Sequence, residues 1–153
     1  YMGYRTCYYR TFVCGKPTSD QVKAYEKAWK WLKDSIDAVK PGATTADVAK
    51  AWPGPEAFGL KTEEEAFLLQ FGHGVGLSIW EKPVISRLMS LENPYPIREG
   101  MVFALETYCP SADGRGAARI EEEVVVTKDG GERIFKYPIE ELISCGLPGT
   151  MAY

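Results

Sequence analysis

The sequence predicts an α+β fold in which helices cover a curved antiparallel sheet. Three features of the 153-residue chain support this prediction. An aromatic and threonine-rich stretch opens the chain, apolar residues at helical spacing follow it, and strand-like segments continue from residue 101. A strand followed by helices and then by a run of strands is typical of an antiparallel sheet covered by helices.

The first stretch, residues 4–14, reads YRTCYYRTFVC and stops at Gly15-Lys16-Pro17, so we expect a strand or one limb of a hairpin. Thr18 and Gln21 then form a capping box, which marks the start of a helix. Apolar residues alternate at spacings of three and four after it, which predicts a surface helix with one buried face. These residues are Val22, Tyr25, Trp29, Leu32, Ile36 and Val39.

Two shorter helices are expected next. One begins at Thr44 or Thr45 and continues to Trp52, between segments that contain Pro and Gly. The other spans residues 62–69 and begins with a capping box of the form Thr-x-x-Glu. After it, residues 77–80 (LSIW) are expected to form a strand.

Residues 101–109 and 117–127 are the most strongly strand-like segments of the chain. The turn sequence Lys128-Asp129-Gly130-Gly131 predicts a hairpin that leads into a further strand over residues 133–137. Residues 83–99 contain several prolines and show no clear periodicity, so we expect a long loop there.

The end of the chain predicts a closing helix over residues 139–145, with Pro138 in its first turn and Gly146 after its last residue. At 17.1 kDa, residues 1–153 are enough for a single domain with a sizeable core. The sequence begins at Tyr1 within a strand-like pattern, without an initiator Met or a signal peptide. We therefore expect a fragment or a processed chain.

The composition argues against several classes of function. A net charge of −3 and a pI near 5.3 give no basic stripe, so a role in nucleic-acid binding has no electrostatic support. No apolar run approaches the ~18 residues that span a bilayer. The cysteines lack C-x-x-C spacing and are too sparse for a disulfide scaffold, which predicts reduced thiols in a cytoplasmic protein. They are Cys7, Cys14, Cys109 and Cys145.

His73 is the only histidine, and it lies within Gly72-His73-Gly74-Val75-Gly76. Glycines permit either a close approach of the backbone or a positive φ. This setting suits a ligand or catalytic side chain in a narrow cleft, and it equally suits a turn with an incidental histidine.

Glu106 and Glu121 favour the first alternative, because each is placed in an apolar run that reads as a buried strand. Carboxylates are rarely buried unless they are paired or bound to metal. One His and two Glu suit a divalent ion such as Zn, Mn, Fe or Co. The alternative for Glu121 is an acidic run on a solvated strand. Alternation places Glu121 and Glu123 on one face with Arg119, which is available to pair with Glu121, and Glu122 on the other.

At this point the motifs form a set that resembles the pita-bread metallopeptidase family. This family includes Xaa-Pro aminopeptidase (aminopeptidase P), prolidase, methionine aminopeptidase and the non-peptidase creatinase. Four blocks in the family's order carry the resemblance. They are Gly3-Tyr4 to Phe12 with Gly15-Lys16-Pro17, then residues 72–77, then residues 100–106, and last Arg119-Ile120-Glu121 before residues 124–127.

The resemblance implies a pita-bread domain of which residues 1–153 form the C-terminal part. Family members bind one or two divalent metals with two Asp, one His and two Glu. His73, Glu106 and Glu121 match the His and the two Glu. The first Asp is expected before Tyr1, and the second falls at Cys7, within the family pattern Gly-Tyr-x-x-Asp-x-x-Arg-Thr-Phe.

Two positions therefore depart from the family. A thiolate at Cys7 cannot bridge two ions as a carboxylate does, but it can bind one softer metal such as Zn or Fe. The alternative is that Cys7 is a buried thiol at a site without metal. Trp80 occupies the position of the family's second His, which contacts the substrate. It is either a residue of the core or cleft wall or a cation-π platform for a cationic substrate.

The resemblance implies a metal-dependent hydrolase of the prolidase type that acts on a dipeptide or a small amide, with one ion if any. His73, Glu106 and Trp80 are the candidate catalytic residues. His73, Glu106, Glu121 and Cys7 are the candidate metal ligands. Family members often dimerise, so a homodimer is also implied.

Two alternatives remain open at the level of sequence. One is non-peptidase chemistry, such as creatinase-like C–N hydrolysis or elimination of the dimethylsulfoniopropionate-lyase kind. The other is a catalytically silent binding module.

Overall fold

In a computed structural model, which describes residues 2–146, helices cover one face of an antiparallel sheet. The predicted α+β class is therefore confirmed. The five strands of the sheet lie in the order β3-β2-β4-β5-β6. They are β2 (Gly72–Gly74), β3 (Glu81–Val84), β4 (Val102–Pro110), β5 (Ala117–Thr127) and β6 (Gly130–Arg133).

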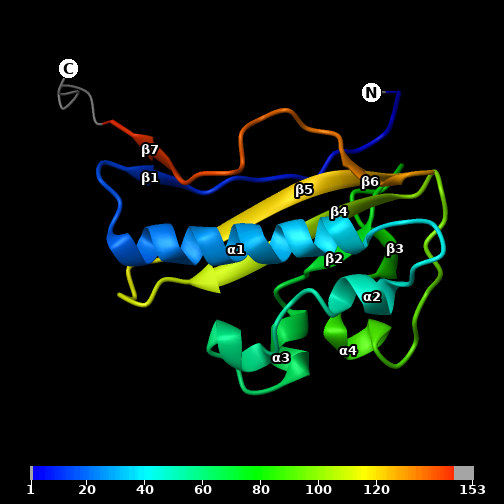
Figure 1. Cartoon of the computed structure of the whole chain (residues 1–153), viewed down its shortest axis with the longest axis horizontal. Coiled ribbons are helices and arrows are strands. Elements are labelled where there is room, and N and C mark those ends of the chain that lie inside the picture. The colour runs from blue at the N-terminus through cyan, green and yellow to red at the C-terminus, as the bar shows by residue number, and fades with distance from the viewer. Residues whose placement is uncertain (1, 147–153) are drawn as a thin grey trace.

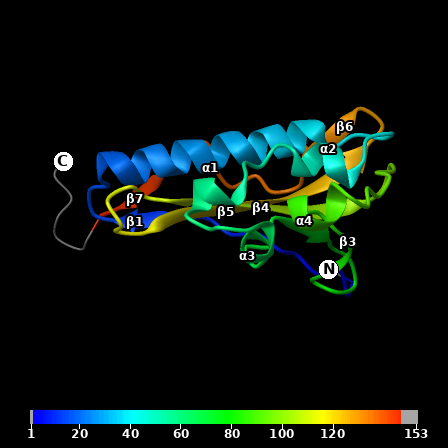
Figure 2. The ribbon, with the colours of Figure 1, turned by 90° about the horizontal axis from the view of Figure 1, so that it is seen from below.

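Helix α1 (Ser19–Ala38) lies across β4 and β5 and covers one face of the sheet, as Figures 1 and 2 show. It begins as predicted, because the Thr18 hydroxyl accepts from Gln21 N–H and the Gln21 side chain accepts from Thr18 N–H. The predicted apolar stripe faces the sheet. The core between them includes Tyr25, Leu32 and Ile36 of the helix and Phe103, Leu105, Ile120 and Val124 of the strands.

The two shorter helices form where expected but end earlier. They are α2 (Thr45–Ala49) and α3 (Glu63–Phe67), with a 3₁₀ helix at Pro55–Phe58 between them. The predicted long loop over residues 83–99 is wrong in its first half, because it contains the end of β3 and a further short helix, α4 (Arg87–Ser90). The Ser86 hydroxyl caps α4 by accepting from Met89 N–H. Ser86 was therefore a local indication of a helix start, but the prolines of this segment favoured a loop.

The first and last strands form a small parallel pair, β1 (Phe12–Cys14) with β7 (Ile143–Cys145). The strand expected over residues 4–14 is therefore confined to its last three residues, and the strand expected over 133–137 ends at Arg133. The closing helix expected over residues 139–145 is wrong. The backbone there takes part in strand pairing and in contacts with side chains instead of in helical hydrogen bonds.

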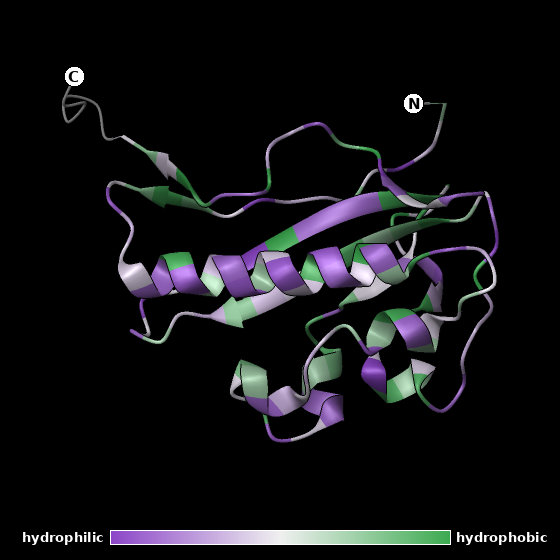
Figure 3. Cartoon of the chain, viewed as in Figure 1, coloured by the Kyte–Doolittle hydropathy of each residue, from purple (hydrophilic) through white to green (hydrophobic). Residues whose placement is uncertain are grey.

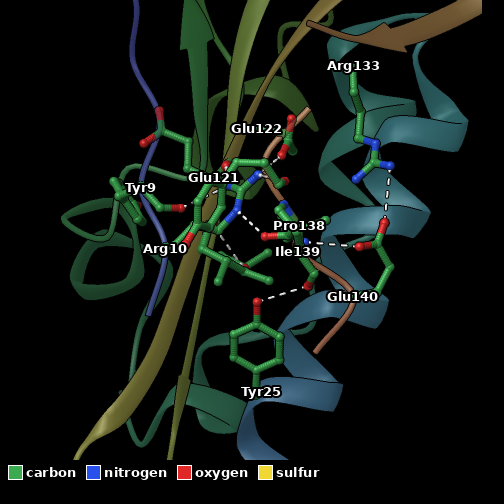
Figure 4. Close-up of polar contacts among 12 residues, drawn as sticks. Tyr9, Arg10, Tyr25, Glu121, Glu122, Arg133, Pro138, Ile139 and Glu140 are labelled. Atoms are coloured by element: carbon green, nitrogen blue, oxygen red, sulfur yellow. Dashed lines mark hydrogen bonds and ion pairs between the residues drawn. The ribbon is translucent and has the colours of Figure 1, made fainter. Parts of the chain in front are cut away.

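Tyr25 of α1 contacts the first residue of this segment, because its hydroxyl donates to the Ile139 carbonyl at 2.9 Å. Arg10 contacts the two residues before it, and Figure 4 shows its side chain near Pro138. The Arg10 guanidinium donates to the carbonyls of Tyr137 and Pro138 at 3.2 and 3.1 Å and forms a buried ion pair with Glu122. Arg10 and Tyr25 therefore hold residues 137–139 at the entrance to this segment.

We predict that Arg10→Ala lowers the free energy of unfolding by about 3–5 kcal/mol, because it leaves the Glu122 carboxylate buried without its cation. Chemical denaturation of the two proteins measures the difference. Lys30→Ala is the matched control, since the pair of Lys30 with Asp34 is exposed and such pairs contribute less than ~1 kcal/mol. An equal effect of the two substitutions would show that the buried pair does not stabilise the fold.

Candidate active site

His73 lies on β2, which is hydrogen-bonded to β3 on one side and to β4 on the other. The glycines beside it are required by close contacts, since their φ angles are not positive. A Cβ on Gly72 would lie 3.0 Å from the Cβ of Ile85. A Cβ on Gly74 would lie 2.8 Å from the Lys82 carbonyl oxygen. The glycines therefore allow β2 to fit between β3 and β4. The imidazole of His73 is buried.

The two carboxylates lie on the next two strands. Glu106 of β4 and Glu121 of β5 are directly opposite each other, and His73 pairs with Ala104, which places it diagonal to Glu106. His73, Glu106 and Glu121 are 2%, 3% and 0% exposed. Three adjacent strands thus bring together the His and the two Glu that the sequence singled out.

The acidic run 121–123 is not a solvated strand, so that interpretation is wrong. All three glutamates are buried, and Figure 3 shows them as a hydrophilic stretch in the middle of β5. The predicted alternation holds, because Glu122 pairs with Arg10 whereas Glu121 and Glu123 both influence Cys7. The site therefore occupies the face of β5 that does not carry Glu122.

Glu106 is held through both of its oxygens. Oε1 lies 3.4 Å from His73 Nε2, and Oε2 accepts from Arg119 Nη2 at 2.9 Å and from the Tyr9 hydroxyl. Arg119 Nε also donates to the Tyr9 oxygen at 2.6 Å. Burial and then the Glu106 charge raise the pKa of Tyr9, so its hydroxyl stays protonated and donates. Arg119 and Tyr9 therefore fix the carboxylate and supply its countercharge.

Glu121 has no such partners. Among residues 2–146 no arginine, amide or hydroxyl donates to either of its oxygens, and the weakly donating thiol of Cys7 is its side-chain hydrogen-bond partner. Burial and then the Glu106 charge raise the pKa of Glu121 to about 7, against the opposing influence of Cys7 and His73. Burial and then the nearby Glu121 raise the pKa of the Cys7 thiol to about 12, so in the absence of a cation the thiol is protonated.

The orientation of His73 indicates where positive charge is needed. Its Nδ1 lies 2.9 Å from the Gly74 carbonyl oxygen, which can only accept, so Nδ1 carries a proton. In the neutral ring, Nε2 then presents a lone pair toward Glu106 Oε1, which is also an acceptor. Burial lowers the pKa of His73, but the Glu106 carboxylate and the Gly74 carbonyl outweigh it and raise the pKa. A proton or a metal cation satisfies this arrangement.

The donor set fits a divalent metal. One ligand atom each from Cys7, His73 and Glu121 lies within 4.8 Å of the others. Histidine ligands commonly donate their second N–H to a backbone carbonyl, as His73 does to Gly74. The buried Glu121 carboxyl, which has no arginine, amide or hydroxyl donor among the described residues, is the group that most directly favours a cation here.

Trp80 lies outside the core, contrary to the core interpretation, and is 43% exposed. The strand expected over residues 77–80 is also wrong, because these residues form bends before β3. The indole centroid lies 6.0 Å from that of His73, with an angle of 38° between the rings. The exposed indole of Trp80 therefore lies beside the His73 imidazole.

Sequence reasoning missed Tyr9 and assigned Arg119 to the wrong carboxylate. Arg119 pairs with Glu106 rather than with Glu121. Two-residue spacing was the available signal, since Tyr9 follows Cys7 by two residues, and such residues share a face in extended backbone. The contact between Tyr9 and Glu106 joins segments 97 residues apart, which no local pattern indicates.

The sequence model that describes metallopeptidase family M24 matches residues 1–128 of the chain. The Xaa-Pro dipeptidase of Pyrococcus horikoshii is 32% identical over 141 residues, which are 89% of this chain and 37% of that protein. A Mycobacterium tuberculosis protein described as "probable dipeptidase PepE" is 32% identical over 143 residues, 92% of this chain and 36% of its own. The chain therefore spans little more than a third of the length of these relatives.

The crystal structure of dipeptidase PepE from Mycobacterium ulcerans is also similar, with a TM-score of 0.75 and 31% identity. The match covers 95% of this chain and 37% of that one. The expected pita-bread fold is thereby confirmed. Among residues 2–146, no helix has the length and apolar character needed to cross a membrane.

We predict that Glu121→Gln stabilises the metal-free chain increasingly as the pH rises from 4 to 8. Between pH 4.5 and 7 the carboxyl is ionised in the unfolded chain but still protonated in the folded one, because its folded pKa is about 7. The parent therefore loses stability over this window and no more above it, whereas the amide of the variant does not titrate. At ~1.4 kcal/mol per unit, the advantage of the variant should grow by about 3 kcal/mol. Denaturation in chelator at several pH values measures it, with exposed Glu132→Gln as the control. A constant difference would contradict the prediction.

Proposed function

Since the chain belongs to metallopeptidase family M24, we propose that it carries the reaction centre of a prolidase-like hydrolase that cleaves a dipeptide or a small amide. The observation that carries this proposal is the convergence of His73, Glu106 and Glu121, with no arginine, amide or hydroxyl donating to Glu121 among the described residues. The expectation that residues 1–153 form the C-terminal part of one larger catalytic domain stays a prediction, as does a homodimer.

A divalent ion belongs to this proposal, with His73 Nε2 and the Glu121 carboxylate as its ligands. When bound, such an ion polarises a substrate carbonyl and lowers the pKa of a water to ~7. Glu121 supplies a carboxyl group that forms no ion pair with an arginine or lysine among the described residues. The His73 ring is oriented for this role by its hydrogen bond to Gly74.

Glu106 is the proposed general base. Arg119 and Tyr9 hold its Oε2, so Oε1 is the oxygen available to take a proton from an attacking water on the side of His73. Because Arg119 and Tyr9 fix this carboxylate, Glu106 is positioned before the substrate arrives. Trp80 can donate and stack but cannot shuttle a proton, so the chain relies on Glu106 for proton transfer.

The substrate class comes from the relatives, which are named as dipeptidases. Their names favour hydrolysis of a short peptide over the creatinase-like, elimination and binding-module alternatives. An exposed indole 6.0 Å from His73 is suited to stacking on a flat or apolar substrate group, such as a proline ring.

We predict that the intact chain hydrolyses dipeptides, including Xaa-Pro dipeptides, that a chelator abolishes this activity, and that added divalent metal restores it. Glu106→Gln should lower the rate by about 10²–10⁴-fold, because it removes the proposed general base. Release of the free amino acid measures the rate. Exposed Glu132→Gln should leave it unchanged. Hydrolysis that resists both the chelator and Glu106→Gln would exclude this mechanism.

We further predict that Trp80→His raises the rate of dipeptide hydrolysis at least about ten-fold, because it places a proton carrier beside His73. Ile79→His is the matched control, since it adds an imidazole at the adjacent exposed residue. A comparison of kcat and KM for both variants separates a proton-transfer effect from a change in binding. Equal rates for Trp80→His and Ile79→His would show that position 80 does not take part.

A further inference from the structure

The Cys7 thiol supplies a sulfur atom to a site whose other proposed ligand atoms are oxygen and nitrogen. It lies with His73 and Glu121 in the group whose ligand atoms are all within 4.8 Å of one another. We propose, on the basis of the function proposed above, that Cys7, His73 and Glu121 hold one soft divalent ion, Zn²⁺ or Fe²⁺. Glu106 stays outside this set of ligands.

The distribution of charge supports this division between the two carboxylates. Arg119 already balances Glu106, and Tyr9 donates to the same oxygen. Glu121 is fully buried and has no arginine, amide or hydroxyl donor among the described residues, while the weakly donating Cys7 thiol is its side-chain hydrogen-bond partner. A buried carboxylate without a cation is costly. Of these two carboxylates, Glu121, next to the sulfur of Cys7, is therefore the one that a cation would stabilise.

The backbone holds Cys7 at this place from both sides. Arg5 N–H donates to the Gly76 carbonyl at 2.8 Å, and Glu121 N–H donates to the Tyr9 carbonyl at 3.1 Å. The first contact ties the chain before Cys7 to the end of the His73 segment, and the second ties the chain after it to β5. The thiol is thus placed between the imidazole and the carboxylate by the same contacts that dock the N-terminal segment.

This ligand set predicts the kind and the number of ions. A thiolate favours Zn²⁺ or Fe²⁺ over Mn²⁺ or Mg²⁺. On binding, the thiol loses its proton to solvent, and the thiolate and the Glu121 carboxylate together neutralise the two positive charges of the ion. Three protein ligands leave a further position for a water or a substrate, as in catalytic zinc sites. A second ion is not expected, because Glu106 is engaged by Arg119.

The test loads the intact chain with Zn²⁺, Mn²⁺ or Co²⁺ separately, removes free metal by dialysis, and measures the metal that remains by elemental analysis. Absorption of the Co²⁺ form in the near ultraviolet reports a bond between sulfur and metal. The variants are Cys7→Ser and Cys7→Asp, and the control is Cys14→Ser, which changes an exposed thiol. Circular dichroism verifies that each variant is folded.

We expect one Zn²⁺ per chain, weaker Mn²⁺ binding, and a sulfur band in the Co²⁺ form. In Cys7→Ser the band should vanish and the Zn²⁺ affinity should fall at least about 10- to 100-fold. Mutation of a residue that only hydrogen-bonds a metal ligand already causes a loss of this size. Cys7→Asp should also lose the band while its preference shifts toward Mn²⁺. Cys14→Ser should behave as the parent.

If the Co²⁺ form shows no sulfur band and Cys7→Ser binds Zn²⁺ as the parent does, the role of Cys7 is overturned. The proposed metal-dependent hydrolase would remain. Two ions per chain would overturn the single-ion centre. Absence of bound metal in the folded parent would overturn both this inference and the proposed function.

Discussion

The need to balance buried negative charge governs how this chain is assembled around β4 and β5. Four glutamates of these strands are buried, and an isolated buried carboxylate is among the most costly groups in a protein. Arg10 balances Glu122 and Arg119 balances Glu106. Glu121 and Glu123 have no arginine partner among the described residues, and both lie on the face of β5 that carries the site. The buried carboxyl groups without an arginine therefore lie on the face where an imidazole and a thiol are also present.

The N-terminal segment connects these interactions because it runs along β5 with alternating side chains. Cys7 and Tyr9 reach the site, whereas Arg10 reaches Glu122 and residues 137–138. In extended backbone, a shift of the register by one residue exchanges the two faces. Such a shift would remove the cation from Glu122 and the thiol from Glu121 together. The stability of the fold and the composition of the site therefore depend on the same register.

Periodic signals made the larger elements predictable from the sequence, and isolated short segments were not. The stripe of α1 and its Thr18 cap, the strands β4 and β5, and the alternation along residues 121–123 each rest on several residues that agree. Residues 139–145 offered only a Pro and a Gly as helix boundaries. In the structure Tyr25 holds Ile139, Arg10 holds Pro138 just before it, and residues 143–145 pair with β1, all through partners distant in sequence. Tertiary contacts thus override a weak local preference.

The candidate site shows the same division. His73, Glu106 and Glu121 were found from the sequence because a lone histidine among glycines and acids within apolar runs are unusual on their own. The partners that distinguish Glu106 from Glu121 could not be found, because they depend on which rotamer a long arginine adopts and on a tyrosine far away in the sequence. Chemically similar glutamates acquire different roles from those partners alone.

This difference also sets the direction of the proposed chemistry. Arg119 and Tyr9 both bind Oε2 of Glu106, so a proton delivered to that oxygen would have to displace a charged donor and a hydroxyl. Oε1 is the remaining oxygen, and it faces His73. A water that gives up its proton must therefore approach from the His73 side, where the exposed indole of Trp80 stands. In the proposed mechanism, Trp80 consequently lies along the path of the substrate. It occupies the position where the family has its second His, so the absence of a proton carrier there affects turnover as well as binding.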